Sequence, residues 1–350
     1  RTKDLLLGRG SPRRTTDPVA QPVHQDMVVE QVHPVEAASP VGVHNGAGNW
    51  DIQLCSPSKI NLFLRIVRRR MDGYHDLASL FQAISLSDEV SISLLPETAT
   101  DDIFECDMEG VPTDRTNLVL RAVDVFRMRS GVRRFFRIRL TKTVPAQAGL
   151  GGGSGNAATT LYGLNELCGR PGSPDDLEDW SKQLGSDATF FFSQGTAYCT
   201  GRGEILDPKP ALRPTSMYIV KPEVGLSTPA VFKALDLDSR STTDPESLLR
   251  LHLDALDGPD KFVNDLEQPA FDCIPELAML KAKLKLLGFP VVSMSGSGTS
   301  LFCLGEPDPS RLPAEGWPAC ITNSDTFPWP IKVFPATFLN RDASGWYKSS

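Results

Sequence analysis

The sequence predicts a globular protein of the α/β or α+β class, organised in two parts. Strand-like and helix-like stretches alternate in both halves of the chain from Trp50 onward, which is typical of these classes. The proline-rich segment 208–214 (PKPALRP) separates the halves, and this composition favours a linker between domains. With 40% hydrophobic and 23% charged residues over 350 positions, the chain can form one large or two medium cores. We therefore expect domains at 50–212 and 213–350.

The first 49 residues are expected to be disordered, because they lack hydrophobic periodicity and are rich in Pro, Val, Gln, Gly and His. Their first fourteen residues contain one acid, Asp4, and five cations, which are Arg1, Lys3, Arg9, Arg13 and Arg14. This excess of positive charge suits the remnant of an organellar transit peptide.

In the first half, apolar patterning and cap residues predict strands and helices. Strands are expected over 52–54, along the apolar stretch 55–66, and over 90–95 and 136–141. One helix is expected over 116–128, with Thr116 near its cap, and a second directly follows the glycine-rich segment. A third is expected over 175–184, preceded by Pro174. A turn is expected at 72–77, and a strand pair at 196–200 and 204–206 across Gly201 and Gly203.

In the second half, a strand is expected over 217–220 and a helix over 228–235, with Pro229 in its first turn. A second helix is expected over 275–287, ending at Gly288. The apolar residues Val291 and Val292 and the run 301–304 flank Ser-Gly-Ser-Gly at 295–298, which predicts a strand-turn-strand hairpin.

The segment 145–159 (PAQAGLGGGSGNAAT) carries five glycines within seven residues. It follows the alternating strand 136–141 and leads into an apolar helical stripe that Ser154 or Asn156 could cap. Glycine lets backbone N–H groups approach a ligand, and a helix N-terminus attracts anions. The segment is therefore predicted to bind phosphate, with a flexible turn as the alternative.

The two familiar phosphate loops do not fit this segment. A Walker A loop ends in Gly-Lys-Ser/Thr, and the residues that follow the triple glycine here are Ser154, Gly155 and Asn156. A Rossmann fingerprint that starts at Gly149 requires glycine at position 154. Another class of phosphate loop must apply.

Three other stretches contain residues suited to chemistry. Lys59 and Asn61 lie two apart in a strand-like stretch, so their side chains share a face, although a solvated lysine is the alternative. Asp187 precedes an apolar run and is either a helix cap or a catalytic base. The glycines in 295–298 bring backbone close to a neighbour, although a tight hairpin would also use them.

Composition excludes several functions. The net charge of −7 leaves no general basic surface for nucleic acid, and no run approaches eighteen apolar residues, so no membrane span is expected. The seven cysteines include no C-x-x-C pair, which favours reduced thiols over a disulfide framework or a zinc site. A small molecule is the expected partner, bound by a monomer or homodimer.

Four motifs occur in a fixed order along the chain: P-S-K-I-N-L-F-L at 57–64, D-G-Y-H at 72–75, G-L-G-G-G-S at 149–154 and G-S-G at 296–298. In these motifs the chain resembles the GHMP kinases and, among them, the 4-diphosphocytidyl-2-C-methyl-D-erythritol kinase family. The resemblance implies an α+β GHMP two-domain fold, with a ribosomal-S5-like N-terminal ATP-binding domain and a ferredoxin-like C-terminal domain. It also implies ATP-dependent phosphorylation of the substrate's 2-hydroxyl in the non-mevalonate (MEP) isoprenoid pathway, with Mg²⁺ held by ligands that the motifs do not identify.

The same resemblance assigns roles to single residues. Asp187 matches the catalytic base, and Lys59 matches the lysine that positions the hydroxyl. Tyr74 and Phe232 match aromatic residues on either side of the cytosine, and His75 matches the residue that hydrogen-bonds its edge. The matched ATP-phosphate loop consists of Pro145, Gly149, Leu150, Gly151, Gly152, Gly153, Ser154, Gly155 and Asn156. Further matched substrate contacts are Asn61, Lys142, Thr228, Gly296, Ser297 and Gly298.

The chain departs from the family pattern at several positions. Gly155 stands where the family has a second serine, Gln147 and Ala148 replace small or glycine residues, and Thr189 replaces a proline. These changes bear on ATP affinity and on the rigidity of Asp187. The alternatives are therefore another GHMP kinase, acting on mevalonate-type or sugar substrates, and a non-catalytic nucleotide-binding homologue.

Three segments resemble the plastid forms of the family: 190–193, 199–204 (CTGRGE) and 345–347 (GWY). Together with the basic N-terminal segment, they predict the plastid stroma as the location. The bacterial cytoplasm is the alternative, because the pathway also occurs in bacteria.

Overall fold

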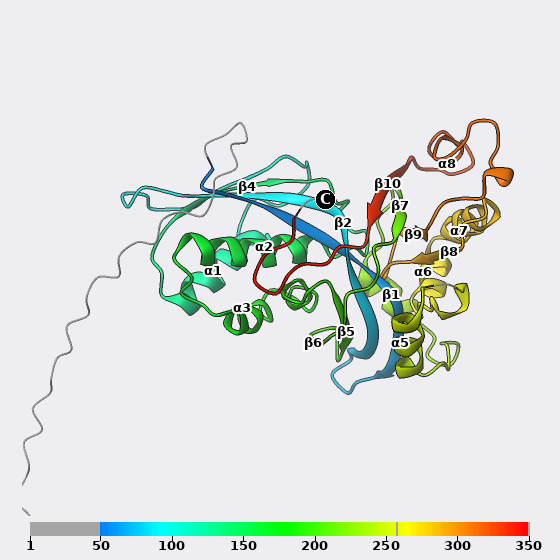
Figure 1. Ribbon diagram of the computed structural model, residues 1–350, viewed down its shortest axis with the longest axis horizontal. Coiled ribbons are helices and arrows are strands. Elements are labelled where there is room, and N and C mark those ends of the chain that lie inside the picture. Colours follow the sequence, from blue (N-terminus) through cyan, green and yellow to red (C-terminus); the bar gives the residue numbers. More distant parts are fainter. Residues whose placement is uncertain (1–49, 257, 349–350) are drawn as a thin grey trace, which may run out of the picture. The chain divides into compact units, whose positions relative to one another are not determined.

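The computed structural model describes residues 50–256 and 258–348, so the predictions for residues 1–49 lie outside the described residues. The fold is built on a long antiparallel hairpin formed by β1 (Ile52–Arg69) and β2 (His75–Leu94) (Figure 1). Its register runs from Ile52 opposite Ile92 to Arg69 opposite His75, with irregularities at three places. This hairpin connects the two halves of the described chain.

The first sheet has six strands in the order β3-β4-β2-β5-β6, with β1 paired to β2. Its other strands are β3 (Ile103–Cys106), β4 (Phe136–Thr141), β5 (Thr196–Thr200) and β6 (Ile205–Pro208). Helices α1 (Leu118–Ser130), α2 (Gly152–Leu167) and α3 (Pro174–Ser181) cover one face of this sheet (Figure 1). The short helix η1 (Thr189–Phe192) leads from α3 into β5.

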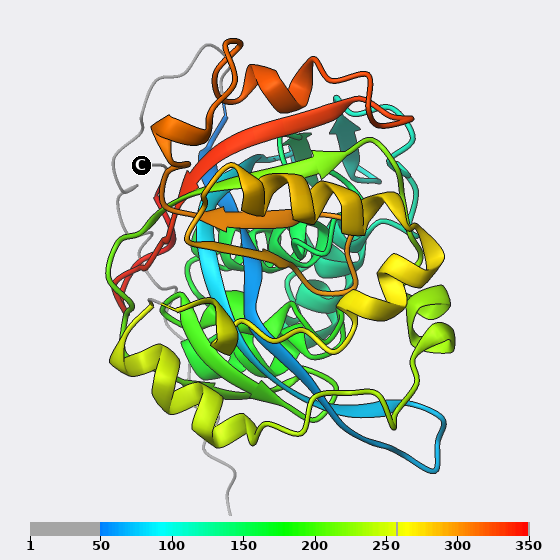
Figure 2. The ribbon, with the colours of Figure 1, turned by 90° about the vertical axis from the view of Figure 1, so that its right-hand side faces the viewer.

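The second sheet is antiparallel, with four strands in the order β10-β7-β9-β8. Its strands are β7 (Ser216–Pro222), β8 (Val291–Met294), β9 (Leu301–Leu304) and β10 (Ile331–Thr337). Between β7 and β8 come α4 (Thr228–Ala234), α5 (Pro245–Asp254), η2 (Pro259–Lys261), α6 (Glu267–Cys273) and α7 (Glu276–Leu286). Between β9 and β10 come η3 (Pro309–Arg311) and α8 (Ala319–Thr322). Figure 2 shows α7 lying over this sheet, roughly along its strands. This βαββαβ order confirms the ferredoxin-like prediction.

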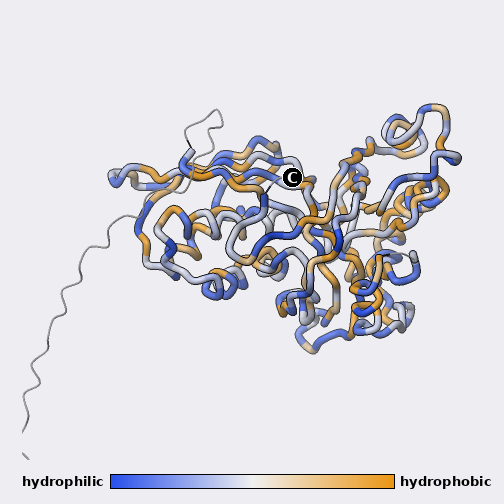
Figure 3. The backbone as a smooth tube through the Cα atoms, viewed as in Figure 1, coloured by the Kyte–Doolittle hydropathy of each residue, from blue (hydrophilic) through white to orange (hydrophobic). Residues whose placement is uncertain are grey.

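Strand β1 confirms the strands predicted over 52–54 and 55–66, and its central part is buried on both faces. Every residue from Ser56 to Ile66 is buried, because one part of the strand faces the first core and another part faces the core under the second sheet. Alternation of apolar and polar residues marks only half-buried strands. In the hydropathy view, the loop between β1 and β2 is hydrophilic while the strands are mixed (Figure 3).

Most predicted elements are confirmed, and the exceptions are of three kinds. The strand predicted at 90–95 is the end of β2, which begins at His75. Ser154 and Asn156 do not cap α2: its N-cap is Gly151, without a side-chain hydrogen bond. Elements β3, α5, α6, α8 and β10 were not predicted. Several of these are short or packed between larger elements, where local periodicity is a weak signal.

The C-terminal segment 338–347 returns to the first sheet. The backbone N–H of Leu339 donates to Ala83 O at 2.8 Å, and Trp346 Nε1 donates to Cys55 O at 3.0 Å. Arg341 Nε donates to Ser193 O at 2.8 Å, just after η1. This segment therefore braces the region that follows Asp187.

His252 on α5 makes stability depend on pH. Its imidazole is fully buried between the rings of Phe63 and Phe262, and burial lowers its pKa from 6.5 to about 4. As the pH falls, the unfolded chain takes up this proton near pH 6.5 while the folded chain remains neutral. The stabilisation is therefore complete above that pH and is lost as the pH falls toward 4. We expect this group to lower the free energy of unfolding by about 2 kcal/mol between about pH 7 and 5.

Urea unfolding at both pH values, with the wild type and His252→Gln, measures this contribution. Glutamine retains an N–H group for Leu248 O, which His252 Nδ1 contacts at 2.8 Å, but it does not titrate. The variant should therefore lose about 2 kcal/mol less than the wild type on acidification. An equal loss in both proteins would contradict the assignment to His252.

Candidate active site

Lys59 on β1 and Asp187, just before η1, form an ion pair. Lys59 Nζ lies 3.3 Å from Asp187 Oδ2, and the two side chains are 4% and 31% exposed. The same Nζ donates to Asn61 Oδ1 at 2.8 Å, which confirms that Lys59 and Asn61 share a face, and it lies 4.4 Å from the ring centroid of Phe81. A buried ammonium thus holds a carboxylate that remains open to a ligand.

The glycine loop lies directly against this pair. Leu150 O accepts a hydrogen bond from the backbone N–H of Lys59 at 2.8 Å. Gly151 has a φ of 67°, and a Cβ there would lie 3.0 Å from Lys59 Cγ. The loop therefore needs glycine to approach the lysine so closely.

Helix α2 presents its N-terminus without neutralising groups. Its N-cap Gly151 supplies no side-chain hydrogen bond, and its first turn contains no acid. The first N–H groups of a helix have no intrahelical acceptor and carry partial positive charge. This end of α2 is suited to an anion such as phosphate.

The departure at Gly155 has a packing explanation. A Cβ at Gly155 would lie 2.4 Å from Pro57 O, because α2 passes close to β1 at this point. A serine would require the helix or the strand to shift. Gly155 thus sets the distance between the glycine loop and the strand that carries Lys59.

Lys142 lies beside the start of α2. Its Nζ forms an ion pair with the buried Asp88 and lies 3.4 Å from Asn156 Oδ1. A Cβ at Gly152 would be 3.5 Å from the same Nζ. The structure thus brings Lys142 to the glycine loop, whereas its predicted role was a substrate contact.

The late glycine segment, residues 295–298, contacts the glycine loop, residues 149–153. Ser295 Oγ donates to Gly149 O at 3.0 Å, and a Cβ at Gly149 would lie 2.1 Å from Ser295 O. A Cβ at Gly296 would lie 3.4 Å from Asn61 Oδ1. Thr228 Oγ1, at the start of α4, lies 2.8 Å from Ser297 Oγ. These predicted residues from both halves are therefore neighbours.

The predicted aromatic residues make two separate contacts in this structure. His75 stacks on Phe232, with ring centroids 5.2 Å apart and planes at 24°, and burial together with Arg69 lowers the pKa of His75. Tyr74 is 58% exposed, and the guanidinium of Arg202 lies 5.1 Å from its ring centroid. The proposed position of a cytosine between Tyr74 and Phe232 stays a prediction.

Two site residues were missed from the sequence. Lys221 is buried, and its Nζ donates to Pro222 O, Val224 O and Thr299 Oγ1, each at 2.7 Å, which ties the late glycine segment to the loop before α4. Burial lowers its pKa to about 8. A lysine inside an apolar strand was the available signal. Arg202 was visible in the segment 199–204, but nothing local indicated that it would reach Tyr74.

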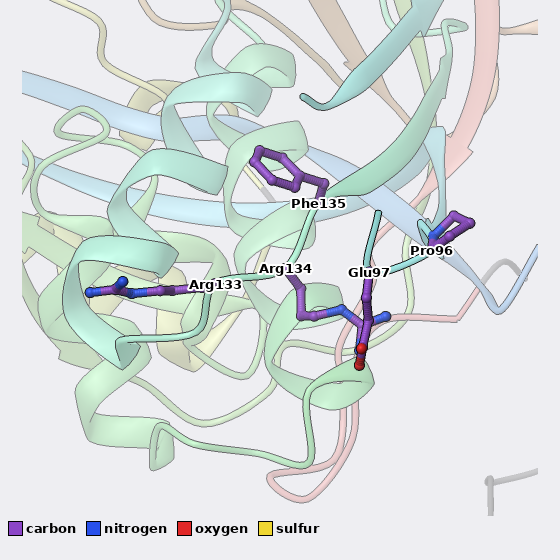
Figure 4. A pocket seen from close by; sticks show the side chains of 5 residues that line it. All are labelled: Pro96, Glu97, Arg133, Arg134 and Phe135. Carbon is purple, nitrogen blue, oxygen red and sulfur yellow. The ribbon is translucent and has the colours of Figure 1, made fainter. Parts of the chain in front are cut away.

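A pocket elsewhere on the surface contains none of the predicted site residues. It is lined by Pro96, Glu97, Arg133, Arg134 and Phe135 (Figure 4). These residues lie past the Leu94 end of β2, whereas Lys59 and Asn61 lie opposite Ala83 and Phe81, near the middle of that strand. In the described part of the chain, no three His, Cys, Asp or Glu side chains form a metal-binding group, and no helix is long and apolar enough to cross a membrane.

Comparisons with known proteins agree with this geometry. Residues 117–195 match the model of the GHMP kinases N terminal domain, and the fold is that of this class of kinase. The chain is 43% identical over 313 residues to the chloroplastic 4-diphosphocytidyl-2-C-methyl-D-erythritol kinase of Oryza sativa subsp. japonica, covering 87% of this chain and 75% of that protein. It is 41% identical over 300 residues to the enzyme of that name from Protochlamydia amoebophila, covering 86% and 94%. The chain belongs to the 4-diphosphocytidyl-2-C-methyl-D-erythritol kinase family.

Solved structures show the same relationship. A crystal structure of 4-(cytidine 5'-diphospho)-2C-methyl-D-erythritol kinase matches with a TM-score of 0.66 and 30% identity, covering 82% of this chain and 98% of that one. A mevalonate kinase matches with a TM-score of 0.60 at 12% identity, covering 83% and 100%. The second likeness supports the two-domain fold alone.

Proposed function

We propose that this chain transfers the γ-phosphoryl group of ATP to the 2-hydroxyl of 4-diphosphocytidyl-2-C-methyl-D-erythritol, giving the 2-phosphate and ADP in the MEP isoprenoid pathway. Family membership supports the substrate. The observation that carries the proposal is the pair of Lys59 and Asp187, 3.3 Å apart and directly against the glycine loop. It also argues against a non-catalytic homologue, because both residues are present and joined.

In this mechanism Asp187 accepts the proton of the substrate hydroxyl as the oxygen attacks the γ-phosphorus. Lys59 keeps the carboxylate in place: two of its three N–H groups face Asn61 and Asp187, and the third remains for the hydroxyl. Because phosphoryl transfer needs little covalent work from the protein, position and charge supply most of the catalysis.

The phosphates of ATP would lie at the N-terminus of α2. Glycine at 149, 151 and 152 lets this loop pack against Ser295, Lys59 and Val144. Lys142 beside Gly152 adds positive charge, although Asp88 offsets part of it. Mg²⁺ bound together with ATP neutralises phosphate charge and usually takes few protein ligands. Ser154, in the first turn of α2, and Asp187 would be the residues to hold such an ion.

The cytidyl end of the substrate would lie by His75 and Phe232, whose rings form a flat surface. Asn61, Thr228 and the segment 296–298 lie between this surface and the glycine loop. Tyr74 would also line this pocket, with its ring against the guanidinium of Arg202.

Phe232→Ala is expected to raise the KM for the cytidyl substrate about tenfold, because stacking on a base contributes roughly 1 to 3 kcal/mol. The KM for ATP should remain at the parental value. Steady-state kinetics with each substrate varied in turn measures both constants. Phe104→Ala, on the edge strand β3, is the control: it should lower stability and leave both KM values unchanged. A parental KM in Phe232→Ala would remove cytosine from this surface.

We also propose the division into domains at 50–212 and 213–350, because each sheet draws its strands from one of these ranges. The segment 338–347 would then be an extension of the second domain onto the first. For location we propose the plastid stroma, supported by chloroplastic relatives in Oryza sativa and Arabidopsis thaliana. The bacterial relative in Protochlamydia amoebophila supports the alternative of a bacterial cytoplasm.

One assay tests the proposed function. ADP release is followed with ATP, Mg²⁺ and one of three acceptors: the cytidyl substrate, mevalonate or galactose. We expect turnover with the cytidyl substrate alone. Turnover with mevalonate or galactose instead would favour another GHMP kinase, and ATP binding without turnover of any acceptor would favour a non-catalytic homologue.

A further inference from the structure

The turn between β5 and β6 brings an arginine to the proposed active site. Gly201 O accepts a hydrogen bond from the backbone N–H of Leu77 at 2.7 Å, which fastens the turn to the start of β2. Gly203 lies on the other side of the turn, where a Cβ would be 3.6 Å from Asp187 Oδ1. Arg202 therefore stands between the strand that carries His75 and the carboxylate of Asp187.

The side chain of Arg202 is held in one direction by stacking. Its guanidinium lies 5.1 Å from the ring centroid of Tyr74. The turn is stiffened separately, because the backbone N–H of Arg202 donates to Glu204 Oε2 at 2.6 Å. The arginine is thus oriented before any ligand arrives.

Its hydrogen-bonding capacity is unused. The side chain is 45% exposed, and the nearest carboxylate oxygen, Glu204 Oε1, is 3.9 Å from Nε, too far for a hydrogen bond. Within residues 50–256 and 258–348, no acceptor takes a hydrogen bond from the guanidinium. Five N–H donors in a planar fork are available, the geometry that suits phosphate oxygens.

We propose that Arg202 binds the diphosphate of the cytidyl substrate. This inference rests on the proposed function. The substrate carries a base, a diphosphate and a reactive hydroxyl in that order. With the base at His75 and Phe232 and the hydroxyl at Asp187, the diphosphate passes through the space between them, where Arg202 lies.

Neighbouring cations fit this role less well. Lys59 is engaged by Asp187 and Asn61, and Arg70 is paired with Asp72 and Asp76. Arg69 lies near enough to lower the pKa of His75 and so belongs to the base end of the site. Arg202 alone among them contacts the pocket aromatic Tyr74 and flanks Asp187.

The test compares two probes that differ only in the diphosphate: cytidine 5'-diphosphate and cytidine. Their dissociation constants are measured by calorimetry without ATP, so the readout does not depend on catalysis. Compared with the wild type, Arg202→Gln should bind cytidine 5'-diphosphate about tenfold more weakly, as expected for the loss of a charged hydrogen bond. Its dissociation constant for cytidine should be unchanged. Arg202→Lys should recover part of the affinity, because it keeps the charge and loses the fork.

Two controls separate this role from packing. Arg213→Gln, an exposed change in the segment 208–214, should leave both dissociation constants unchanged. Tyr74→Ala should weaken the binding of cytidine 5'-diphosphate, because Arg202 is no longer held against the ring. The double variant Tyr74→Ala/Arg202→Gln should bind this probe little more weakly than Arg202→Gln alone, since the two residues act as a unit. Full additivity would overturn the claim that Tyr74 orients the arginine.

The outcomes distinguish the two proposals. If the wild type binds neither probe, the proposed function itself fails. If the wild type binds the diphosphate more tightly than cytidine and Arg202→Gln keeps that preference, the role of Arg202 fails while the proposed function stands. Loss of the preference in Arg69→Gln, with Arg202→Gln unaffected, would transfer the role to Arg69.

Discussion

Asparagine in place of Asp187 is expected to lower the turnover number about a hundredfold or more, because the amide cannot accept the hydroxyl proton. The change keeps the size of the side chain and its reach toward Lys59, 3.3 Å away in the wild type. The dissociation constant for ATP should stay near the parental value, since the glycine loop is untouched. Single-turnover kinetics and ATP titration of the same preparation measure both effects.

Asp260→Asn provides the control for removing one negative charge, because Asp260 is exposed on η2. It should show parental turnover. Turnover of Asp187→Asn within a few fold of the parent would rule out Asp187 as the base, and Lys59 would then need another explanation.

Alanine at Gly149 is expected to abolish tight ATP binding. The added Cβ would lie 2.1 Å from Ser295 O, and a backbone oxygen cannot move aside as the end of a flexible side chain can. The glycine loop and the late glycine segment would have to separate, breaking the hydrogen bond from Ser295 Oγ to Gly149 O. We expect the dissociation constant for ATP to rise at least about tenfold, given strain of roughly 1 to 3 kcal/mol at such positions.

Gly131→Ala isolates the collision from the backbone strain. Gly131 has a φ of 74° against 72° at Gly149, but nothing lies within 4 Å of its Cβ position. This control should lower the melting temperature modestly and leave ATP binding unchanged. If both alanine variants bind ATP like the wild type, the contact between the two glycine segments does not shape the nucleotide site.

Local sequence determined several parts of this protein. The strand 136–141, the glycine loop and the existence of α2 were predictable because each depends on neighbours within a few residues: alternation, permitted backbone angles and a helical stripe. The N-cap of α2 was not, since it is Gly151 rather than Ser154 or Asn156. The shared face of Lys59 and Asn61 follows from strand geometry in the same way. The roles of the site residues came from motif resemblance, and they stay predictions until the variants are measured.

Tertiary structure decided what the local pattern could not contain. The sequence predicted a strand at 55–66, but only the tertiary structure showed that Ser56 to Ile66 are buried on both faces. The need for glycine at 155 was not visible locally, because it comes from the close passage of α2 past β1, where a Cβ would meet Pro57 O. The pairing of His75 with Phe232 and of Tyr74 with Arg202 joins segments far apart in the chain. Such contacts depend on the order of the strands in each sheet and on which faces of the sheets the helices cover. The residues adjacent in the sequence do not determine either of these.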